Sequence, residues 1–418
     1  MRDRIRFWLG RLRERLWLRP LGASLLSVGA ALLAGGADRY GLEQDVLSIA
    51  PASLESLLSI MASSMLVIAI FSVTSMVAAY ASASTAATPR SFPLVLADDV
   101  SQNALSTFLG AFIFSIVALV GVQNGYFAAP GRFVLFVLTV GILAAVVLTF
   151  VRWVDSVARL GRLGETIDRI EAATAAAIER RRGHPTLGAV PAPEAASGGA
   201  AVFAAGVGYV QRVDVAALQA FAEQAGMRVR VAALPGTFAT PDRPLAHVVS
   251  DSGVPARFDT GPVIRAFRIG RARVFDDDPR FGLVVMAETA ARALSPAVND
   301  PGTAIDITGR LVRLLLRWGE PTSEPAPLPE WDRVEVPALA VRDLFDDAFT
   351  AIARDGAGII EVMTRLQKAL ASLACAGSQE MRQAAVAHAR LAVARAERAS
   401  MLPADLEVVR ALARFADG

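Results

Sequence analysis

Four long apolar stretches occupy the first third of the chain and set its predicted architecture. A helix needs about 20 predominantly apolar residues to cross the hydrocarbon core of a bilayer, where every backbone amide must be paired within the segment. Four stretches fit this requirement: Leu21–Ala37, Leu54–Ala81, Ala104–Val122 and Phe133–Val151. No comparable run follows Trp153. The pattern therefore predicts a four-helix transmembrane domain over residues 21–153.

Arginines flank this region at both ends and predict its orientation. Short flanks rich in Lys and Arg stay on the cytoplasmic side. Arginines precede the first stretch at positions 2, 4, 6, 11, 13, 15 and 19 and follow the last at positions 152, 159, 162 and 169. We therefore expect a multi-pass protein of a bacterial inner membrane with both termini in the cytoplasm. An alternative for the first stretch is a cleaved signal peptide, because its apolar run ends in small residues.

The first 20 residues form a separate predicted element. Apolar side chains recur there at helical spacing, with arginines between them: Ile5, Trp8, Leu9, Leu12 and Leu16. This pattern predicts an amphipathic helix on the inner leaflet over residues 1–20. A solvated charged tail is the alternative.

After residue 153 the pattern predicts a cytoplasmic α+β domain. Apolar residues near heptad spacing predict a stalk helix over 154–183. It can pair with a second copy, which favours homo-oligomerisation, or with its own domain. A Pro- and Ala-rich linker over 184–199 leads to a β-rich module over 200–258, with strand-like alternation around a helix at Val215–Ala225. Residues 259–418 are predicted to be helical and to end in a C-terminal helical bundle. The predicted fold class is thus an α-helical integral membrane protein with this α+β domain attached.

Composition narrows the range of functions. The net charge is only +2, and the bases alternate with acids instead of forming a basic face, so we expect no nucleic-acid partner. The single cysteine, Cys375, excludes an internal disulfide, and three scattered histidines argue against a zinc site. No nucleotide-binding or hydrolase motif is evident. We therefore expect no cofactor, no metal and no catalytic site, and the lipid bilayer is the predicted partner.

The second apolar stretch is unusually rich in hydroxyl side chains. Five of them are candidate site residues: Ser59, Ser63, Ser64, Thr74 and Ser75. Small hydroxyl residues allow close helix packing and hydrogen bonds between helices. They can also line a hydrated pore. The sequence leaves both interpretations open and favours packing.

Two polar motifs lie in the region predicted to be helical. Asp276–Asp278 precede Pro279, which is typical of a helix start, with a divalent-cation site as the alternative. Farther on, Ser295, Pro296, Asn299, Asp300 and Pro301 form a compact motif between two helices. Asp300 suits an N-cap and Pro301 the first helical position, which favours a structural corner. A polar ligand pocket around Asn299, Asp300, Arg292 and Glu288 is the alternative.

This motif also carries a family resemblance. The run Ala293–Pro301, followed by Thr303-Ala304, resembles a bacterial family of predicted membrane proteins called domain of unknown function 2254. Weaker support comes from Ala62–Met65, from Gly208–Gln211 with Asp214, and from Leu234–Gly236 with Phe238. The residues around Thr237 and Thr240 depart from the family pattern. The resemblance covers nearly the whole chain and implies a topology but no activity.

Two functional hypotheses follow. The first is an oligomeric passive or gated pore with a cytoplasmic assembly or sensing domain, motivated by the hydroxyl-rich second span and the heptad-like stalk. The alternative is a non-conducting membrane scaffold or regulatory protein, in which the same hydroxyls are packing contacts.

Overall fold

The computed structural model describes residues 18–36, 49–86, 88–96, 98–159, 162–193, 198–250, 258–320, 328–399 and 401–417. The chain divides into two compact units, Met1–Thr166 and Ile167–Gly418, and each is described by itself. The amphipathic helix predicted for residues 1–20 lies outside the described residues except for its last three, which begin α2.

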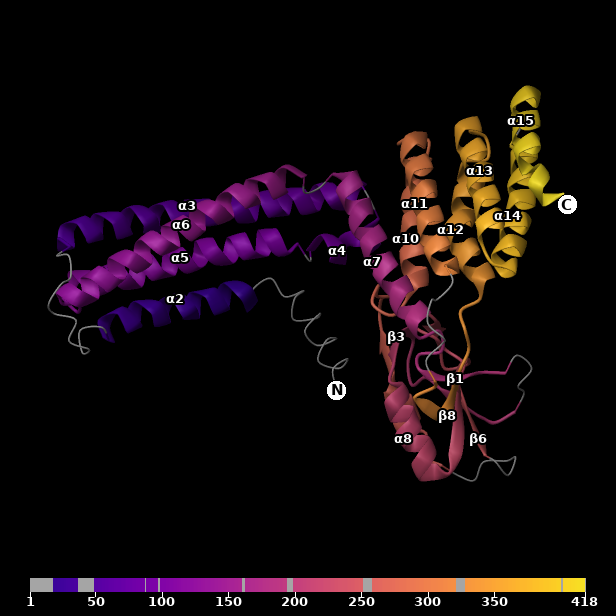
Figure 1. The fold of residues 1–418 in the computed structure, drawn as a ribbon, viewed down its shortest axis with the longest axis horizontal. Coiled ribbons are helices and arrows are strands. Elements are labelled where there is room, and N and C mark those ends of the chain that lie inside the picture. The colour runs from indigo at the N-terminus through magenta and orange to yellow at the C-terminus, as the bar shows by residue number, and fades with distance from the viewer. Residues whose placement is uncertain are drawn as a thin grey trace. The chain divides into compact units, whose positions relative to one another are not determined.

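The first unit is a bundle of apolar helices. Its main helices are α2 (Leu18–Gly36), α3 (Pro51–Ala86), α5 (Asp99–Gln123) and α6 (Ala129–Arg159). They run side by side, and α5 contacts each of the others (Figure 1). Between α3 and α5 lie the short helices η2 (Pro89–Ser91) and α4 (Phe92–Leu96). Asp98 is the N-cap of α5 and accepts a hydrogen bond from the amide of Ser101 at 3.0 Å.

Three of the four predicted spans have the required length and composition. They are Pro51–Ser82, Asp99–Gln123 and Ala129–Val157, and the apolar part of α2, Arg19–Ala34, is shorter. Large apolar side chains fill the interior of the bundle; Phe108, Phe114 and Leu135 are fully buried. Most of the exposed large apolar side chains in the described structure also belong to this unit, for example Leu33 at 77% exposure and Val67 at 67%. Such an outer surface suits hydrocarbon better than water.

The second unit contains two small sheets. The five-stranded sheet has the order β1-β8-β4-β6-β2, and its strands are β1 (Ala189–Pro191), β2 (Ala200–Phe203), β4 (Met227–Val231), β6 (Pro244–Ser250) and β8 (Trp331–Val336). β8 pairs in parallel with β1 and β4, and the β4–β6 and β2–β6 pairs are antiparallel. The three-stranded antiparallel sheet has the order β5-β3-β7, with β3 (Gly208–Val213), β5 (Phe238–Ala239) and β7 (Phe267–Gly270).

Helix α8 (Val215–Ala225) matches the helix predicted at this position and packs on β4 and β8. Its N-cap is Asp214, and it ends at Gly226 in the left-handed conformation, with φ of 62°. A short helix, α9 (Gly261–Ala266), leads into β7.

The remaining elements of this unit are helices packed on one another (Figure 1). They are α7 (Leu163–Gly183), α10 (Pro279–Ala293), α11 (Pro301–Gly319), α12 (Val341–Asp355), α13 (Ile360–Ala376), α14 (Gln379–Arg398), α15 (Pro403–Ala413) and η3 (Arg414–Ala416). Helices α10 and α11 are the two helices predicted on either side of the motif at residues 295–301.

Three local expectations differ from the structure. Strand β1 lies within the segment predicted as a linker, because its backbone pairs with β8. Strands β7 and β8 lie within the part predicted to be helical, since both complete sheets whose other strands precede them in the chain. The predicted stalk belongs to two helices, of which α6 ends at Arg159 and α7 begins at Leu163. The division of the chain into the predicted segments 1–20, 21–153, 154–183, 184–199, 200–258 and 259–418 stays a prediction.

Candidate functional site

The hydroxyl side chains of α3 fall into two groups around the helix. An α-helix turns about 100° per residue, so Ser56, Ser59, Ser63 and Thr74 lie within about 60° of one another. Ser64 and Ser75 point about 100° away from that face. We call the first group, Ser56, Ser59, Ser63 and Thr74, the α3 hydroxyl face. All four of its residues are exposed, whereas Ser75 is half-buried.

Two hydroxyl groups of this face bond to the backbone of α3 itself. Ser63 Oγ donates to the carbonyl of Ser59 at 3.0 Å, and Thr74 Oγ1 donates to the carbonyl of Ile70 at 3.0 Å. A hydroxyl satisfied in this way carries little desolvation cost on a surface that faces lipid or another helix. The α3 hydroxyl face therefore lies on the outside of the bundle, away from its apolar interior.

The interior of the bundle is closed by aromatic packing. The buried ring of Trp153 makes an edge contact with the buried ring of Phe108, at a centroid distance of 6.0 Å. In the middle of α5, Gly110 lies so close to α2 that an added Cβ would be 3.2 Å from Ser27 Oγ. A water-filled path through one copy would require these contacts to separate.

The motif between α10 and α11 forms a tight corner. Asp300 caps α11 by accepting from the amide of Thr303 at 3.1 Å, and the Thr303 hydroxyl donates to its other oxygen at 2.5 Å. These hydrogen bonds favour the charged carboxylate and lower the pKa of Asp300. Pro301 occupies the first turn of α11. The sequence predicts both roles.

The rest of the corner is held by its backbone. The Asp300 amide donates to the carbonyl of Ala293 at 2.8 Å, and the Ser295 hydroxyl donates to the carbonyl of Arg292 at 2.6 Å. Asn299 adopts the left-handed conformation with φ of 50°, which Asn tolerates better than most residues. Pro296 and Asn299 are exposed. This geometry favours the structural interpretation of the motif over a buried ligand pocket.

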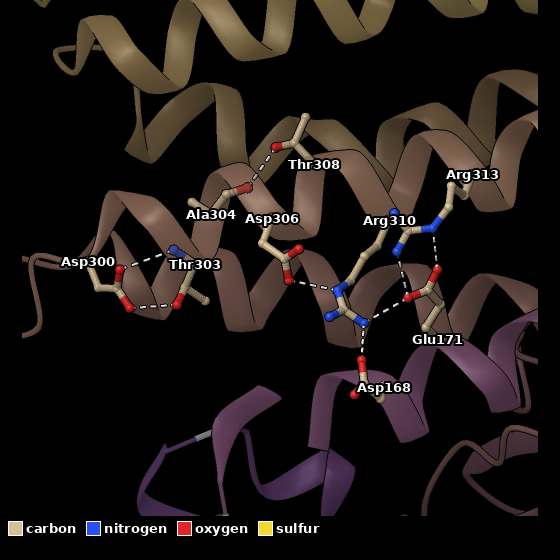
Figure 2. A network of polar contacts seen from close by, with 9 residues as sticks. All are labelled: Asp168, Glu171, Asp300, Thr303, Ala304, Asp306, Thr308, Arg310 and Arg313. Carbon is tan, nitrogen blue, oxygen red and sulfur yellow. Dashed lines mark hydrogen bonds and ion pairs between the residues drawn. The ribbon is translucent and has the colours of Figure 1, made fainter. Parts of the chain in front are cut away.

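An ion-pair network begins one turn farther along α11 (Figure 2). Arg310 pairs with Asp306 at 2.7 Å and with Glu171 of α7 at 2.8 Å, and it also contacts Asp168. Arg313 donates from Nε and Nη2 to the same Glu171, at 2.9 and 3.0 Å. The network joins α7 to α11 through side chains 139 or more positions apart.

The charges of this network support one another. Burial of Arg310, whose side chain is 14% exposed, opposes its charge, but hydrogen bonds to Asp168 and Asp306 raise its pKa above the ordinary value. The hydrogen bond to Glu171 raises the pKa of Arg313. Both guanidinium groups therefore stay charged, and the arrangement suits a clamp between helices better than acid–base chemistry.

Removing Arg310 should weaken this clamp. In an Arg310→Gln variant, Asp168 loses its partner in the network and Glu171 keeps only Arg313. We expect a loss of about 2 kcal/mol in unfolding free energy, the typical worth of charged hydrogen bonds at a partly buried site. Thermal unfolding of the purified chain measures it. Arg313→Gln is the matched control: its side chain is 61% exposed, so the expected loss is below about 1 kcal/mol. Equal losses in the two variants would contradict the assignment of Arg310 as the centre.

A second charged cluster surrounds the triple acid. Asp278 is 2% exposed, caps α10 by accepting from the amide of Phe281 at 3.1 Å, and pairs with Arg273 at 2.7 Å. Burial raises the pKa of Asp277, while Arg212 opposes the shift. Burial lowers the pKa of Arg181 to about 10, against the attraction of Asp277 and Asp278. The helix start predicted here is confirmed. Among the described residues, no group of three or more His, Cys, Asp or Glu side chains is arranged to hold a metal ion.

Sequence reasoning missed the side chains that pair across these helices. A signal existed for the first network, because acids at 168, 171 and 179 and arginines at 310, 313 and 317 each recur at helical spacing. Nothing in the sequence indicated that these two stripes face each other. Arg273, which pairs with Asp278 of the triple acid, and Arg280, which pairs with Asp343 and Asp347, carried no comparable signal.

Comparisons with known proteins place the chain among membrane proteins without an assigned activity. A family described as "Predicted membrane protein (DUF2254)" matches residues 13–372. Uncharacterized protein MT1328 of Mycobacterium tuberculosis (strain CDC 1551 / Oshkosh) is 35% identical over 107 residues, which cover 25% of this chain and 20% of that protein. Uncharacterized protein Mb1321c of Mycobacterium bovis is 34% identical, with the same coverage. The chain thus spans about a fifth of the length of these curated relatives. No solved structure matches the chain.

Proposed function

Because the chain belongs to the family of predicted membrane proteins DUF2254, we propose that it is a multi-pass protein of a bacterial inner membrane with four spans, α2, α3, α5 and α6. The apolar outer surface of the bundle supports this proposal. Further support comes from Arg19, which pairs with Asp99 at 2.6 Å and donates to Asn103 at 2.9 Å. These contacts join the N-terminal ends of α2 and α5, which must lie on the same side if four consecutive helices cross the membrane up and down.

The arginine-rich flanks support a cytoplasmic location for those ends, both termini and the second unit. In this arrangement Arg19 and Asp99 lie near the cytoplasmic surface, where a charged pair avoids the hydrocarbon core. A reporter enzyme that is active only in the periplasm, fused after Gly418, should be inactive. An active fusion would overturn the orientation.

We propose further that copies of the chain associate in the membrane and that the assembly serves as a non-conducting scaffold or regulatory protein, without a catalytic step. One observation carries this proposal: the α3 hydroxyl face lies outside a bundle whose interior is filled with apolar side chains. Small hydroxyl residues on an outer face let two membrane helices approach closely. The proposed partner is therefore the same face of a second copy.

Disulfide cross-linking in native membranes tests the association. A Cys375→Ser background removes the native thiol, which is exposed on α13. Ser63→Cys in this background should yield a covalent dimer on mild oxidation. Val147→Cys, 54% exposed on α6, is the matched control and should remain monomeric. Failure of Ser63→Cys to cross-link, or equal cross-linking at both positions, would reject α3 as the interface.

A pore between copies is the second candidate, favoured by the same exposed hydroxyls. Reconstituted liposomes separate the two functions. A scaffold that cross-links through Ser63 should leave an entrapped ion gradient intact. Ion flux that is abolished by Ser63→Leu would replace the scaffold by a pore lined by this face.

A further inference from the structure

The second unit contains a polar pocket that neither the membrane bundle nor the two candidate motifs explain. It has a volume of about 290 Å³ and lies between the turn after β4 and the start of α12, with Gly236, Arg273, Arg280, Leu339, Ala340 and Asp343 among its lining residues. This volume is at the lower end of the range for small-molecule sites, so it suits a small ligand.

Two arginines supply the charge of the pocket. Arg273 donates hydrogen bonds from Nε and Nη2 to the carboxylate of Asp278, at 2.7 and 3.0 Å. Arg280 donates from Nε to Asp347 and from Nη1 to Asp343, both at 2.6 Å. A guanidinium carries five N–H donors, so each arginine has donors beyond the hydrogen bonds described for it. The carboxylates of Asp278 and Asp347 are 2% and 17% exposed, and they anchor the two guanidinium groups in place.

The start of α12 adds backbone donors to the same pocket. The N-cap is Ala340, and its side chain makes no capping hydrogen bond. The first amides of a helix have no partner within it, and the helix dipole makes this end positive. Both features favour a negatively charged group beside Leu339 and Ala340.

The carboxylate of Asp343 is a negatively charged group at this end of α12. It lies in the first turn of α12, its side chain is 45% exposed, and among the lining residues it is the one acid. Opposite it stand Arg273 and Arg280, whose guanidinium groups also pair with Asp278 and Asp347. Because Asp343 is half-exposed and holds Arg280 through a single oxygen, a stronger oxyanion can displace it at little cost.

The turn that closes the pocket is held against the same cluster. Gly236 has φ of 94°, and a Cβ added to it would lie 2.4 Å from a carboxylate oxygen of Asp278. The turn backbone is tied to β3, because the Gly236 amide donates to the carbonyl of Val210 at 2.8 Å. The wall is therefore preorganised, which lowers the entropic cost of binding a small ligand.

We propose that this pocket binds a phosphate-type oxyanion, held between Arg273, Arg280 and the first amides of α12, and that Asp343 occupies the anion position when the ligand is absent. Arg is suited to this role, since its planar guanidinium matches the geometry of phosphate oxygens. The phosphate group can belong to a soluble molecule or to a lipid headgroup.

Calorimetric titration of the purified full-length chain in a neutral detergent tests the proposal, with inorganic phosphate as the probe. Arg280→Gln should weaken phosphate binding at least about tenfold, the scale of a lost charged hydrogen bond. Asp343→Asn should strengthen it about tenfold, because the competing carboxylate is gone while Arg280 keeps Asp347. Arg354→Gln, at the other end of the same helix and 65% exposed, is the control and should bind as the unmodified chain does.

The two substitutions at the pocket have opposite expected signs, so a folding defect in Arg280→Gln does not remove the test. No heat of binding in either the unmodified chain or Asp343→Asn would overturn the proposal. Equal weakening in Arg280→Gln and Arg354→Gln would also overturn it, since that result indicates a nonspecific effect of net charge. A second titration with a short-chain phosphatidic acid distinguishes a lipid headgroup from a soluble phosphate. If the pocket accepts lipid headgroups, added inorganic phosphate should displace the phosphatidic acid. If the two do not compete, the site is assigned to soluble phosphates.

Discussion

Gly282→Val should strongly destabilise the second unit. Gly282 is buried on α10, where it faces Thr174 of α7. A Cβ at position 282 would lie 1.9 Å from Thr174 Oγ1 and 2.7 Å from its Cβ. Thr174 is fully buried and its hydroxyl donates to the carbonyl of Ile170 at 2.6 Å, so it has no open space to move into. Overpacking costs ~1–3 kcal/mol for added methylene groups, and we expect valine to reach or exceed the upper value.

Thermal unfolding of the purified chain measures this loss, and a second glycine provides the control. Gly309 lies in α11, and a Cβ there would meet only the guanidinium end of Arg365, at 3.2 Å. Gly309→Ala should therefore be neutral or stabilising by up to ~1 kcal/mol, the helix propensity gained over glycine. A Gly282→Val variant that unfolds at the same temperature as Gly309→Ala would show that α7 and α10 do not pack closely. Gly282→Ala should also lower the unfolding free energy, because its Cβ would meet Thr174 Oγ1. Adding Thr174→Ala to this variant removes that oxygen and should recover part of the lost stability.

Asp278→Ala should cost ~3–5 kcal/mol in unfolding free energy. The substitution leaves Arg273, whose side chain is 18% exposed, without its carboxylate, and a buried ion pair that loses one partner is destabilised on this scale. It also removes the N-cap of α10. Asp278→Asn separates the two contributions, since Asn retains the capping oxygen but not the charge. We expect its loss to be intermediate, and chemical denaturation of the three proteins measures all of these values.

The neighbouring acid is the matched control for this prediction. Asp276 is exposed, and the described contact at this residue is made by its backbone carbonyl, which accepts from Arg180. Asp276→Ala should therefore change stability by less than about 0.5 kcal/mol, as for most surface substitutions. Equal losses at positions 276 and 278 would indicate that the triple acid acts through its total charge, which is the cation-site interpretation of this motif.

Features that depend on neighbouring residues in sequence were predictable. The apolar stretches predict α3, α5 and α6 as candidate spans because hydrocarbon demands an uninterrupted run of apolar residues. The caps at Asp98, Asp278 and Asp300 were also readable, since a capping carboxylate bonds to an amide only three residues away. The family was recognisable from the Ala293–Pro301 run for the same reason.

Features that depend on distant residues were not predictable from one sequence. Strand β8 joins β1 and β4 across about a hundred residues or more, so the sequence alone predicts this segment as part of a helical region. Arg310 finds Glu171, and Arg280 finds Asp343 and Asp347, only once the helices pack. The candidate pocket is of this kind, because its lining comes from separate segments around residues 232–237, 273–280 and 338–343.

The position of the α3 hydroxyl groups depends both on their spacing in the sequence and on how the helices pack. Their abundance in the second apolar stretch is a property of the sequence, and so is the angular split that places Ser59, Ser63 and Thr74 on one side of the helix. Whether that side faces the interior or the surroundings depends on which flank of α3 contacts α5 and α6, and packing makes it the outer one. The sequence by itself determined the local periodicities, caps and solvent preference, because short-range geometry and transfer energy act residue by residue. Tertiary structure alone decided which charges meet and which face stays open, because Coulomb and packing energies depend on distances in space that one sequence does not encode.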